Sequence, residues 1–262
     1  RKKYIYLLAA TLLLHFVTKE TSFIYSAQAL IYTAVYFIAR VTRKSWTDHE
    51  GAYRGFIVAL ALGILLGGAA FGFALANRGK GTLSATETAA PANPTGVTSP
   101  FAPTGGSVPI TYILIALAAV TLGVAAYLLI RGYSWTGIRG ERSFDLLILI
   151  GTLVLPSLVA FLIKVLEPVL HISIPTDTAS VNALQPAQIA WVGFLTFLMF
   201  LASAIVGLLW NRDVWWKAAL IFWVPFTVLF TTVFTNSAGF FTGVIGSLGY
   251  WLVQQGVERG SQ

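Results

Sequence analysis

Seven long apolar runs occupy most of this 262-residue sequence, and they constrain its fold more than any motif does. Most of them are close to the roughly 20 residues that a helix needs to cross the hydrocarbon core of a bilayer. In lipid, only helices and closed barrels satisfy every backbone polar group. We therefore predict an all-α, polytopic integral membrane protein, with residues 1–262 forming a single transmembrane helical domain. The predicted membrane helices are Tyr4–Val17, Phe23–Ala39, Phe56–Ala76, Ile110–Ile130, Leu146–Leu166, Ile189–Trp210 and Ala218–Phe234.

The composition agrees with a chain that has little surface in water. Charged residues make up 10% of the sequence, hydrophobic residues 56%, and the mean hydropathy is +0.77. A soluble domain carries about 25% charged residues. The net charge of +7 comes from basic residues in short loops between the apolar runs, so it does not indicate nucleic-acid binding. Cysteine is absent, which excludes disulfides, iron–sulfur clusters and thiolate metal sites.

The basic residues also predict an orientation in the membrane. If the chain crosses the bilayer at each apolar run, Lys and Arg are concentrated on the side of the N-terminus. Because cytoplasmic loops carry the excess of basic residues, we place the N-terminus in the cytoplasm and the C-terminal tail outside. This topology suits the cytoplasmic (inner) membrane of a prokaryote. Six tryptophans lie near the predicted helix ends and are interpreted as interfacial anchors: Trp46, Trp135, Trp191, Trp210, Trp215 and Trp216.

Three outer segments differ from the apolar runs. Residues 78–109 are rich in Gly, Ser, Thr, Ala and Pro, which predicts a mobile outer loop. The outer loop 167–188 contains Glu167, His171 and Asp177, a weak acid–base or metal-binding signal for which a solvated loop is the better interpretation. The glycine-rich tail 235–262 is predicted to be a re-entrant or amphipathic element at the outer surface.

The third apolar run carries glycines at helical spacing, namely Gly63, Gly67, Gly68 and Gly72. Small residues four apart allow two helix backbones to approach closely in lipid. The spacing indicates either an interface with a partner protein or packing within this chain, and packing within the chain is favoured. Pro156 and Pro225 interrupt apolar runs and predict helix kinks.

The outer end of the first run carries two residues that could contact a phosphate. His15 and Lys19 are four residues apart and share one helix face. A lysine at this depth could hold the phosphate of a lipid carrier as a compact point charge. On spacing alone, an interfacial lysine that pairs with Glu20 is the more economical interpretation. A single pigment bound at His15 stays an alternative.

The tail combines aromatic residues with amide and charged ones. Aromatic faces flanked by such groups are typical of saccharide sites, and an interfacial amphipathic helix is an equally good interpretation. The saccharide-site candidates are Tyr250, Trp251, Gln254, Gln255, Glu258 and Arg259.

Two stretches carry a family resemblance. The run from Leu8 to Tyr25, with Thr18-Lys19 at the outer face, resembles a motif of membrane glycosyltransferases related to the protein O-mannosyltransferases, a family-39-like group. The tail from Phe234 to Gln262 resembles a bacterial and archaeal branch of that family, as found in Chloroflexi. Asn236–Gly243 and Gly249–Gln262 carry most of this second likeness.

The resemblance implies a GT-C-like helical membrane portion and transfer of a sugar from a polyprenyl-phosphate donor to an acceptor on the outer face. It gives Lys19 a role at the donor phosphate, with no certain cofactor and a divalent metal left open. The family's catalytic aspartate lies in an acidic outer loop that this sequence lacks. We therefore expect an internal or C-proximal fragment that is inactive alone. The alternatives are a non-catalytic membrane subunit with protein partners, and a transporter of lipid-linked sugars.

Overall fold

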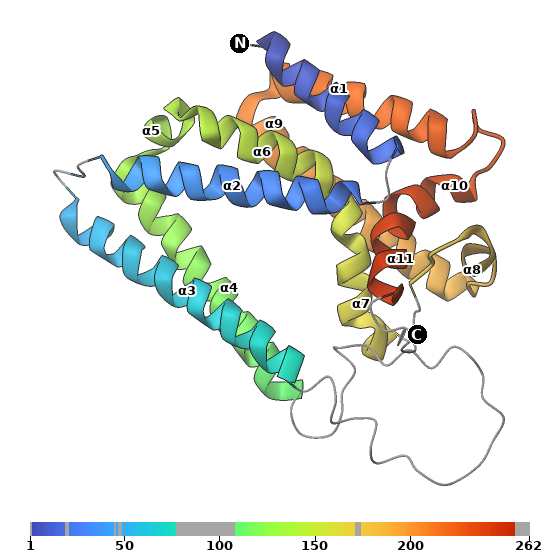
Figure 1. Cartoon of the computed structure of the whole chain (residues 1–262), viewed down its shortest axis with the longest axis horizontal. Coiled ribbons are helices and arrows are strands. Elements are labelled where there is room, and N and C mark those ends of the chain that lie inside the picture. The colour runs from blue at the N-terminus through green and yellow to red at the C-terminus, as the bar shows by residue number, and fades with distance from the viewer. Residues whose placement is uncertain are drawn as a thin grey trace, which may run out of the picture. The chain divides into compact units, whose positions relative to one another are not determined.

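The computed structural model describes residues 2–18, 21–44, 46, 49–76, 108–170 and 174–254, and these residues form helices and turns without a strand (Figure 1). The predicted mobile loop lies almost wholly outside the described residues. The longer helices are α1 (Lys2–Thr18), α2 (Ser22–Thr42), α3 (Glu50–Ala76), α4 (Val108–Tyr133), α6 (Arg142–Val154), α7 (Val159–Leu170) and α9 (Pro186–Phe230). The shorter ones are α5 (Trp135–Gly140), the 3-10 helix η1 (Leu155–Leu158), α8 (Thr178–Asn182), α10 (Ala238–Phe241), the π-helix η2 (Thr242–Gly246) and α11 (Ser247–Gln254).

Five of the described helical segments are long and apolar enough to cross a membrane: Ser22–Thr42, Glu50–Phe73, Ile110–Tyr133, Arg142–Leu166 and Pro186–Phe230. The prediction of an all-α membrane protein is confirmed, but the structure gives five candidate spans and not seven. The first predicted run became α1, which has only 17 residues. At 1.5 Å per residue it is about 25 Å long, less than the hydrocarbon core of a bilayer. The last two predicted runs lie together in the 45 residues of α9.

The two halves of α9 meet at Asn211. Its φ of −161° and ψ of 94° are not helical, and its side-chain oxygen accepts a hydrogen bond of 3.3 Å from the backbone N–H of Val214. Asn211 is thus the N-cap of the second half of α9, a position that asparagine favours. In the fifth predicted run, Pro156 lies in η1, between α6 and α7, so the interruption predicted there is confirmed.

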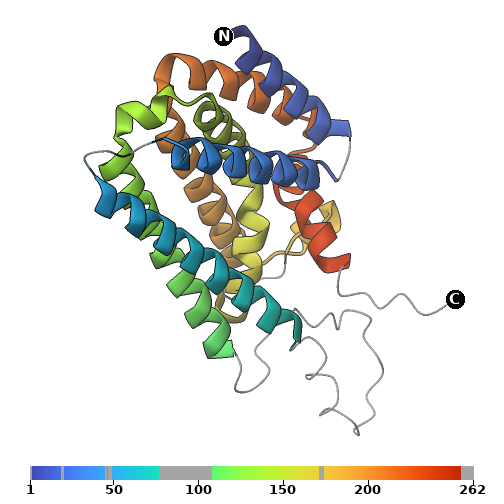
Figure 2. The same cartoon turned by 60° about the vertical axis from the view of Figure 1, so that its left-hand side comes forward.

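The chain divides into two compact units. The first unit contains α1, α2 as far as Ile38, and everything described from Glu141 onward. Figures 1 and 2 both show α1 beside the C-terminal half of α9, where Phe16 packs edge-on against Phe222 with ring centroids 5.7 Å apart. The core of this unit is made of side chains that are completely buried, among them Leu149, Leu153, Val159, Phe222, Phe226, Val244 and Ile245.

The second unit, from Ala39 to Gly140, is built on the pair α3 and α4. A Cβ added at Gly55 would lie 3.0 Å from Leu128, and one at Gly63 would lie 2.7 Å from Leu122. The partner number falls as the residue number rises, so the two helices are antiparallel. Trp46 closes one end of the pair: it is 7% exposed, stacks on Phe56 and donates its indole N–H to the carbonyl of Val41.

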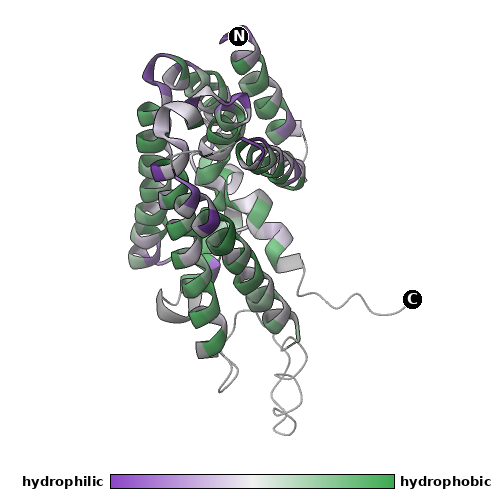
Figure 3. Cartoon of the chain, turned by 90° about the vertical axis from the view of Figure 1, so that its left-hand side faces the viewer, coloured by the Kyte–Doolittle hydropathy of each residue, from purple (hydrophilic) through white to green (hydrophobic). Residues whose placement is uncertain are grey.

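Large hydrophobic side chains cover the outside of the helices. Tyr32 is 74% exposed, Leu209 73% and Leu65 69%, and Figure 3 shows hydrophobic residues along the length of the helices. Monomeric soluble proteins rarely expose contiguous apolar surface on this scale. Together with the five candidate spans, this surface identifies the chain as an integral membrane protein.

Candidate functional site

The first turn of α2 is in contact with two other elements of the first unit. Tyr25 lies edge-on to His15 of α1, with ring centroids 4.9 Å apart. Phe23 lies edge-on to Trp251 of α11, with centroids 5.3 Å apart. Positions two apart on a helix point in different directions, so α1 and α11 meet α2 on different faces. The beginning of α2 thus connects the two stretches in which the sequence suggested donor contacts.

Only some of the predicted phosphate contacts and of the predicted saccharide contacts lie within the described residues. His15 is half-buried, Tyr250 is 48% exposed and Trp251 is 37% exposed, so both tail aromatics have accessible surface. Gln254 is the last residue of α11. Four candidates lie outside the described residues, namely Lys19, Gln255, Glu258 and Arg259.

Close packing of glycines positions α11. A Cβ at Gly246 would lie 2.9 Å from the carbonyl oxygen of Thr176, and one at Gly249 would lie 2.6 Å from Ile174. Earlier in the tail, a Cβ at Gly239 would overlap the carbonyl oxygen of Phe230. Any side chain at these positions would push the tail away from the body of the unit. The glycines therefore bring the tail helices into close contact with the rest of the first unit.

A left-handed turn joins α9 to these tail helices. Thr232, Val233 and Phe234 have φ angles of 49°, 56° and 67°. This conformation costs an L-residue roughly 1–2 kcal/mol, and a β-branched residue adopts it rarely. Thr231 holds the turn: its carbonyl accepts from the N–H of Asn236 at 2.9 Å, and its hydroxyl accepts from the N–H of Phe234 at 3.1 Å. Such outliers persist only where the surrounding structure fixes them.

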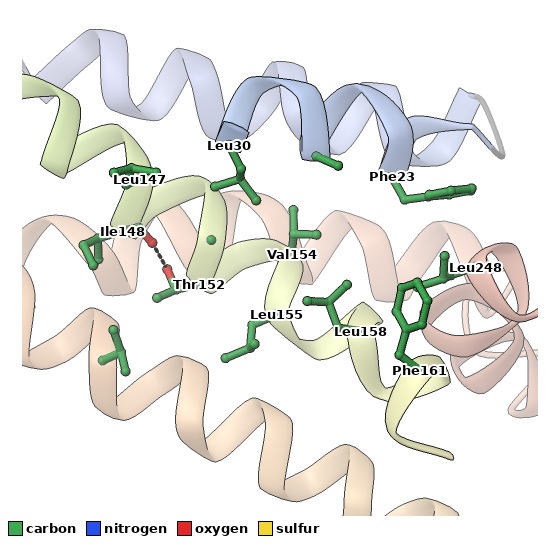
Figure 4. A pocket seen from close by; sticks show the side chains of 13 residues that line it. Phe23, Leu30, Leu147, Ile148, Thr152, Val154, Leu155, Leu158, Phe161 and Leu248 are labelled. Atoms are coloured by element: carbon green, nitrogen blue, oxygen red, sulfur yellow. Dashed lines mark hydrogen bonds between the residues drawn. The ribbon is translucent and has the colours of Figure 1, made fainter. Parts of the chain in front are cut away.

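An apolar cavity of about 460 Å³ opens in the first unit (Figure 4). Its volume is within the range of about 300–1,000 Å³ that is usual for small-molecule sites. Residues of α2, α6, η1, α7, α9 and α11 line it. They are Phe23, Ala27, Leu30, Leu147, Ile148, Gly151, Thr152, Val154, Leu155, Leu158, Phe161, Val206 and Leu248.

Thr152 is the one polar side chain among the lining residues that the structure describes. Its hydroxyl donates to the carbonyl of Ile148 at 2.6 Å and accepts from the indole N–H of Trp215 at 2.9 Å. Its own carbonyl accepts from the Ser203 hydroxyl at 2.6 Å. These bonds join α6 to both halves of α9 and leave the hydroxyl proton engaged. The cavity is therefore suited to an apolar ligand.

The predicted role of three tryptophans is corrected by their burial. Trp46, Trp210 and Trp215 are 7%, 4% and 8% exposed, so they are core residues and not interfacial anchors. Trp210 donates its indole N–H to Asp145 at 3.0 Å, and Trp215 donates to Thr152. Buried indoles usually find a hydrogen-bond partner, as these do. The other three tryptophans of the predicted set are between 41% and 45% exposed.

The glycines of the third predicted run divide into two groups. Gly63 packs against Leu122 and Thr121 of α4, which is the packing within the chain that the sequence favoured. An added Cβ at Gly67, Gly68 or Gly72 would meet no atom of the described residues within 4 Å. These three glycines belong to the second unit, and the described tail residues belong to the first.

The segment 167–188 offers little as a metal site. Asp177 is the N-cap of α8, where its carboxylate accepts from the N–H of Ser180 at 2.7 Å and the Ser180 hydroxyl bonds back to the Asp177 N–H. The hydrogen bonds from Ser180 lower the pKa of the Asp177 carboxyl. His171 lies outside the described residues. Among the residues described, no group of three His, Asp or Glu side chains could hold a metal ion.

No protein-family model, curated protein sequence or solved structure matches this chain. The function of the candidate site must therefore be inferred from the chemistry of its residues. The site combines exposed aromatic residues on α11, the beginning of α2 against them, and an apolar cavity that shares Phe23 with that contact.

Proposed function

We propose that this chain is the membrane portion of a glycosyltransferase that takes a sugar from a polyprenyl-phosphate donor and passes it to an acceptor on the outer face. The observation that carries the proposal is the contact between Phe23 and Trp251. It joins the segment of the predicted phosphate contacts to the segment of the predicted saccharide contacts. The family's catalytic aspartate is not assigned to any residue of this chain.

In this proposal one segment binds the phosphate of the donor and the other segment binds its sugar. Lys19, four residues before Phe23 in the sequence, and His15 contact the phosphate. Lysine suits this role because its ammonium is a compact charge on a flexible stem. Tyr250 and Trp251 offer their exposed ring faces to the sugar. The site belongs on the outer side of the membrane, the side on which the distribution of basic residues places the segment between the first two apolar runs.

Donor binding tests the proposal without requiring transfer. The chain is reconstituted in phosphatidylcholine nanodiscs, and its affinity for polyprenyl-phosphate mannose and polyprenyl-phosphate glucose is measured. We expect saturable binding that weakens about tenfold, or 1.4 kcal/mol, in Lys19→Ala and in Trp251→Ala. Lys19→Arg should retain most of the affinity, because the positive charge is kept.

Trp191→Ala is the matched control, because Trp191 is a similarly exposed tryptophan of the first unit, at 44%. Its affinity should stay that of the unmodified chain. The proposal is wrong if the unmodified chain binds neither sugar donor, or if Trp191→Ala and Trp251→Ala weaken binding equally.

A second candidate function has one observation in its favour. The open faces of Gly67, Gly68 and Gly72 allow a partner helix to approach α3 closely, as expected for a non-catalytic membrane subunit. Gly67→Leu would then prevent association with a partner membrane protein. Gly63→Leu, which meets α4 instead, would disturb the α3–α4 pair. Co-purification from the native membrane distinguishes the two effects.

A further inference from the structure

The turn between α9 and α10 carries two of the more exposed hydrophobic side chains of the first unit. Val233 and Phe234 are each 70% exposed, and Figure 1 shows the turn projecting between the end of α9 and α10. Both residues have positive φ, a conformation that glycine or asparagine adopts at a lower cost. The turn therefore presents two large apolar side chains at positions where a smaller or polar residue would be less strained.

The N–H groups of this turn do not need water as a hydrogen-bond partner. The six consecutive N–H groups from Thr231 to Asn236 all donate within the chain, over donor–acceptor distances of 2.8 to 3.3 Å. Unsatisfied backbone groups are what exclude irregular segments from lipid. Three threonine hydroxyls also donate to backbone carbonyls: Thr227 to Trp223, Thr231 to Thr227 and Thr235 to Thr232. These donors keep their hydrogen bonds when the turn leaves water.

The length of the second half of α9 places the turn at a membrane boundary. The charged residues Arg212 and Asp213 begin this half, and Phe230 ends it about 27 Å further along the helix. That length is close to the roughly 30 Å thickness of a hydrocarbon core. With the charged end at one surface of the bilayer, the turn lies near the other surface. The sequence between Lys217 and Glu258 contains no charged residue that lipid would exclude.

We propose that Val233 and Phe234 insert among the acyl chains just below the phospholipid head groups and anchor the end of α9 in that leaflet. The partner of this surface is the bilayer, because the turn continues an apolar helix surface: Leu220, Val224 and Leu229 of α9 are also exposed. Since α10 follows the turn directly, the anchor also sets the depth of the tail. The anchor goes beyond the proposed function and does not rest on it.

Spin labelling measures the depth of the turn in the intact chain. Because the chain has no cysteine, single nitroxides can be attached to Phe234→Cys, Val224→Cys and Asn182→Cys in phosphatidylcholine nanodiscs. Collisions with oxygen report lipid, and collisions with a water-soluble nickel chelate report water. We expect the label at Phe234 to favour oxygen, though less strongly than the label at Val224, within the second half of α9. The label at Asn182, which is exposed at the end of α8, should favour the nickel chelate.

Two results of this measurement would overturn the proposal. A label at Phe234 that favours the nickel chelate, as the label at Asn182 does, lies in water. A label at Phe234 that neither reagent reaches is covered by protein, either by another part of this chain or by a second copy, and not by lipid.

Substitution of the two side chains separates the lipid contact from the fold of the turn. Val233→Asn with Phe234→Asn removes both apolar side chains, and asparagine adopts positive φ readily, so the turn is retained. Val233→Leu with Phe234→Leu keeps the apolar surface and is the matched control. A nitroxide at Ser237→Cys reports on both variants, because Ser237 is exposed before α10 and its side chain makes no capping bond.

The double asparagine variant should raise the accessibility of the Ser237 label to the nickel chelate several-fold, because the turn moves toward water. The double leucine variant should leave that accessibility unchanged. If the asparagine variant behaves as the unmodified turn does, the two side chains do not anchor it. An equal rise in both variants would show that the fold of the turn matters and its apolar surface does not, which also contradicts the proposal.

Discussion

Phe23, in the first turn of α2, packs edge-on against Trp251 of α11, with ring centroids 5.3 Å apart and ring planes at 64°. The two residues come from opposite ends of the sequence. Such a pairing fixes α11 against the beginning of α2. It also places the exposed Trp251 next to the apolar cavity, because Phe23 both lines the cavity and contacts Trp251.

The aromatic contact should contribute measurably to stability. Phe23→Leu, Trp251→Leu and the double variant form a cycle in which the coupling energy is about 0.5–1.5 kcal/mol, the value for edge-on aromatic pairs. Unfolding in detergent micelles, followed by tryptophan fluorescence, measures it. Strictly additive effects of the two substitutions would show that the rings do not interact.

The tail should not tolerate a methyl group at Gly239. An alanine Cβ there overlaps the carbonyl oxygen of Phe230, which belongs to the backbone and cannot rotate away. We expect Gly239→Ala to lower the free energy of unfolding by about 1–3 kcal/mol. Gly193→Ala, which adds a methyl group in open space, should be neutral or slightly stabilising. Similar midpoints for both variants in thermal unfolding would contradict the close packing of the tail.

The hydrogen bond between Trp215 and Thr152 should link α6 to the second half of α9. Trp215→Phe and Thr152→Val each remove the 2.9 Å bond, and each should cost about 0.5–1.5 kcal/mol. The double variant should cost less than the sum of the two, since both substitutions remove the same bond. Chemical unfolding of the four proteins tests this expectation, and a double variant that costs the full sum would refute it.

The orientation can be tested in a chain that has no native cysteine. Ser84→Cys lies in the predicted outer loop, and Thr136→Cys lies in α5, on the predicted cytoplasmic side. In right-side-out vesicles, a membrane-impermeant maleimide should label Ser84→Cys at once and Thr136→Cys only after permeabilisation. The reverse labelling pattern would show that the chain has the opposite orientation in the membrane.

The sequence predicted the helices because hydrophobic runs of membrane length leave the backbone little choice. It did not predict that the runs on either side of Asn211 continue as one helical element. The charged residues Arg212 and Asp213 lie between the sixth and seventh predicted runs and suggested a loop. In the structure, Asn211 instead caps a helix that resumes at once. An asparagine directly before a helical run is a known N-cap signal and could have indicated the break.

Burial was harder to predict than helicity. Trp210 and Trp215 lie at predicted helix ends, which suggested the membrane interface, but the corner at Asn211 brings both into the core. The turn at Thr232–Phe234 had no sequence signal either, because none of its residues is one that favours positive φ. The tail glycines suggested a re-entrant or amphipathic element, and nothing in the sequence indicated that they pack closely against Phe230, Thr176 and Ile174.

The contact between α2 and α11 had no sequence signal, since spacing relates nothing at residue 23 to residue 251. The apolar cavity had no sequence signal at all. Its wall is drawn from six elements, and each contributes ordinary leucine, isoleucine, valine or phenylalanine residues. Such residues look the same in a sequence whether they fill a core or surround a cavity.

The most direct test of the proposed function identifies the residues that lie next to the sugar of the bound donor. Polyprenyl-phosphate mannose with a photoreactive group on the sugar is bound to the chain in nanodiscs and irradiated, and the labelled residues are identified by mass spectrometry. The account predicts labels on α11 around Tyr250 and Trp251 and on the segment that joins α1 to α2, with suppression by unlabelled donor. Specific labels confined to α3 and α4, or labelling that unlabelled donor leaves unchanged, would contradict it.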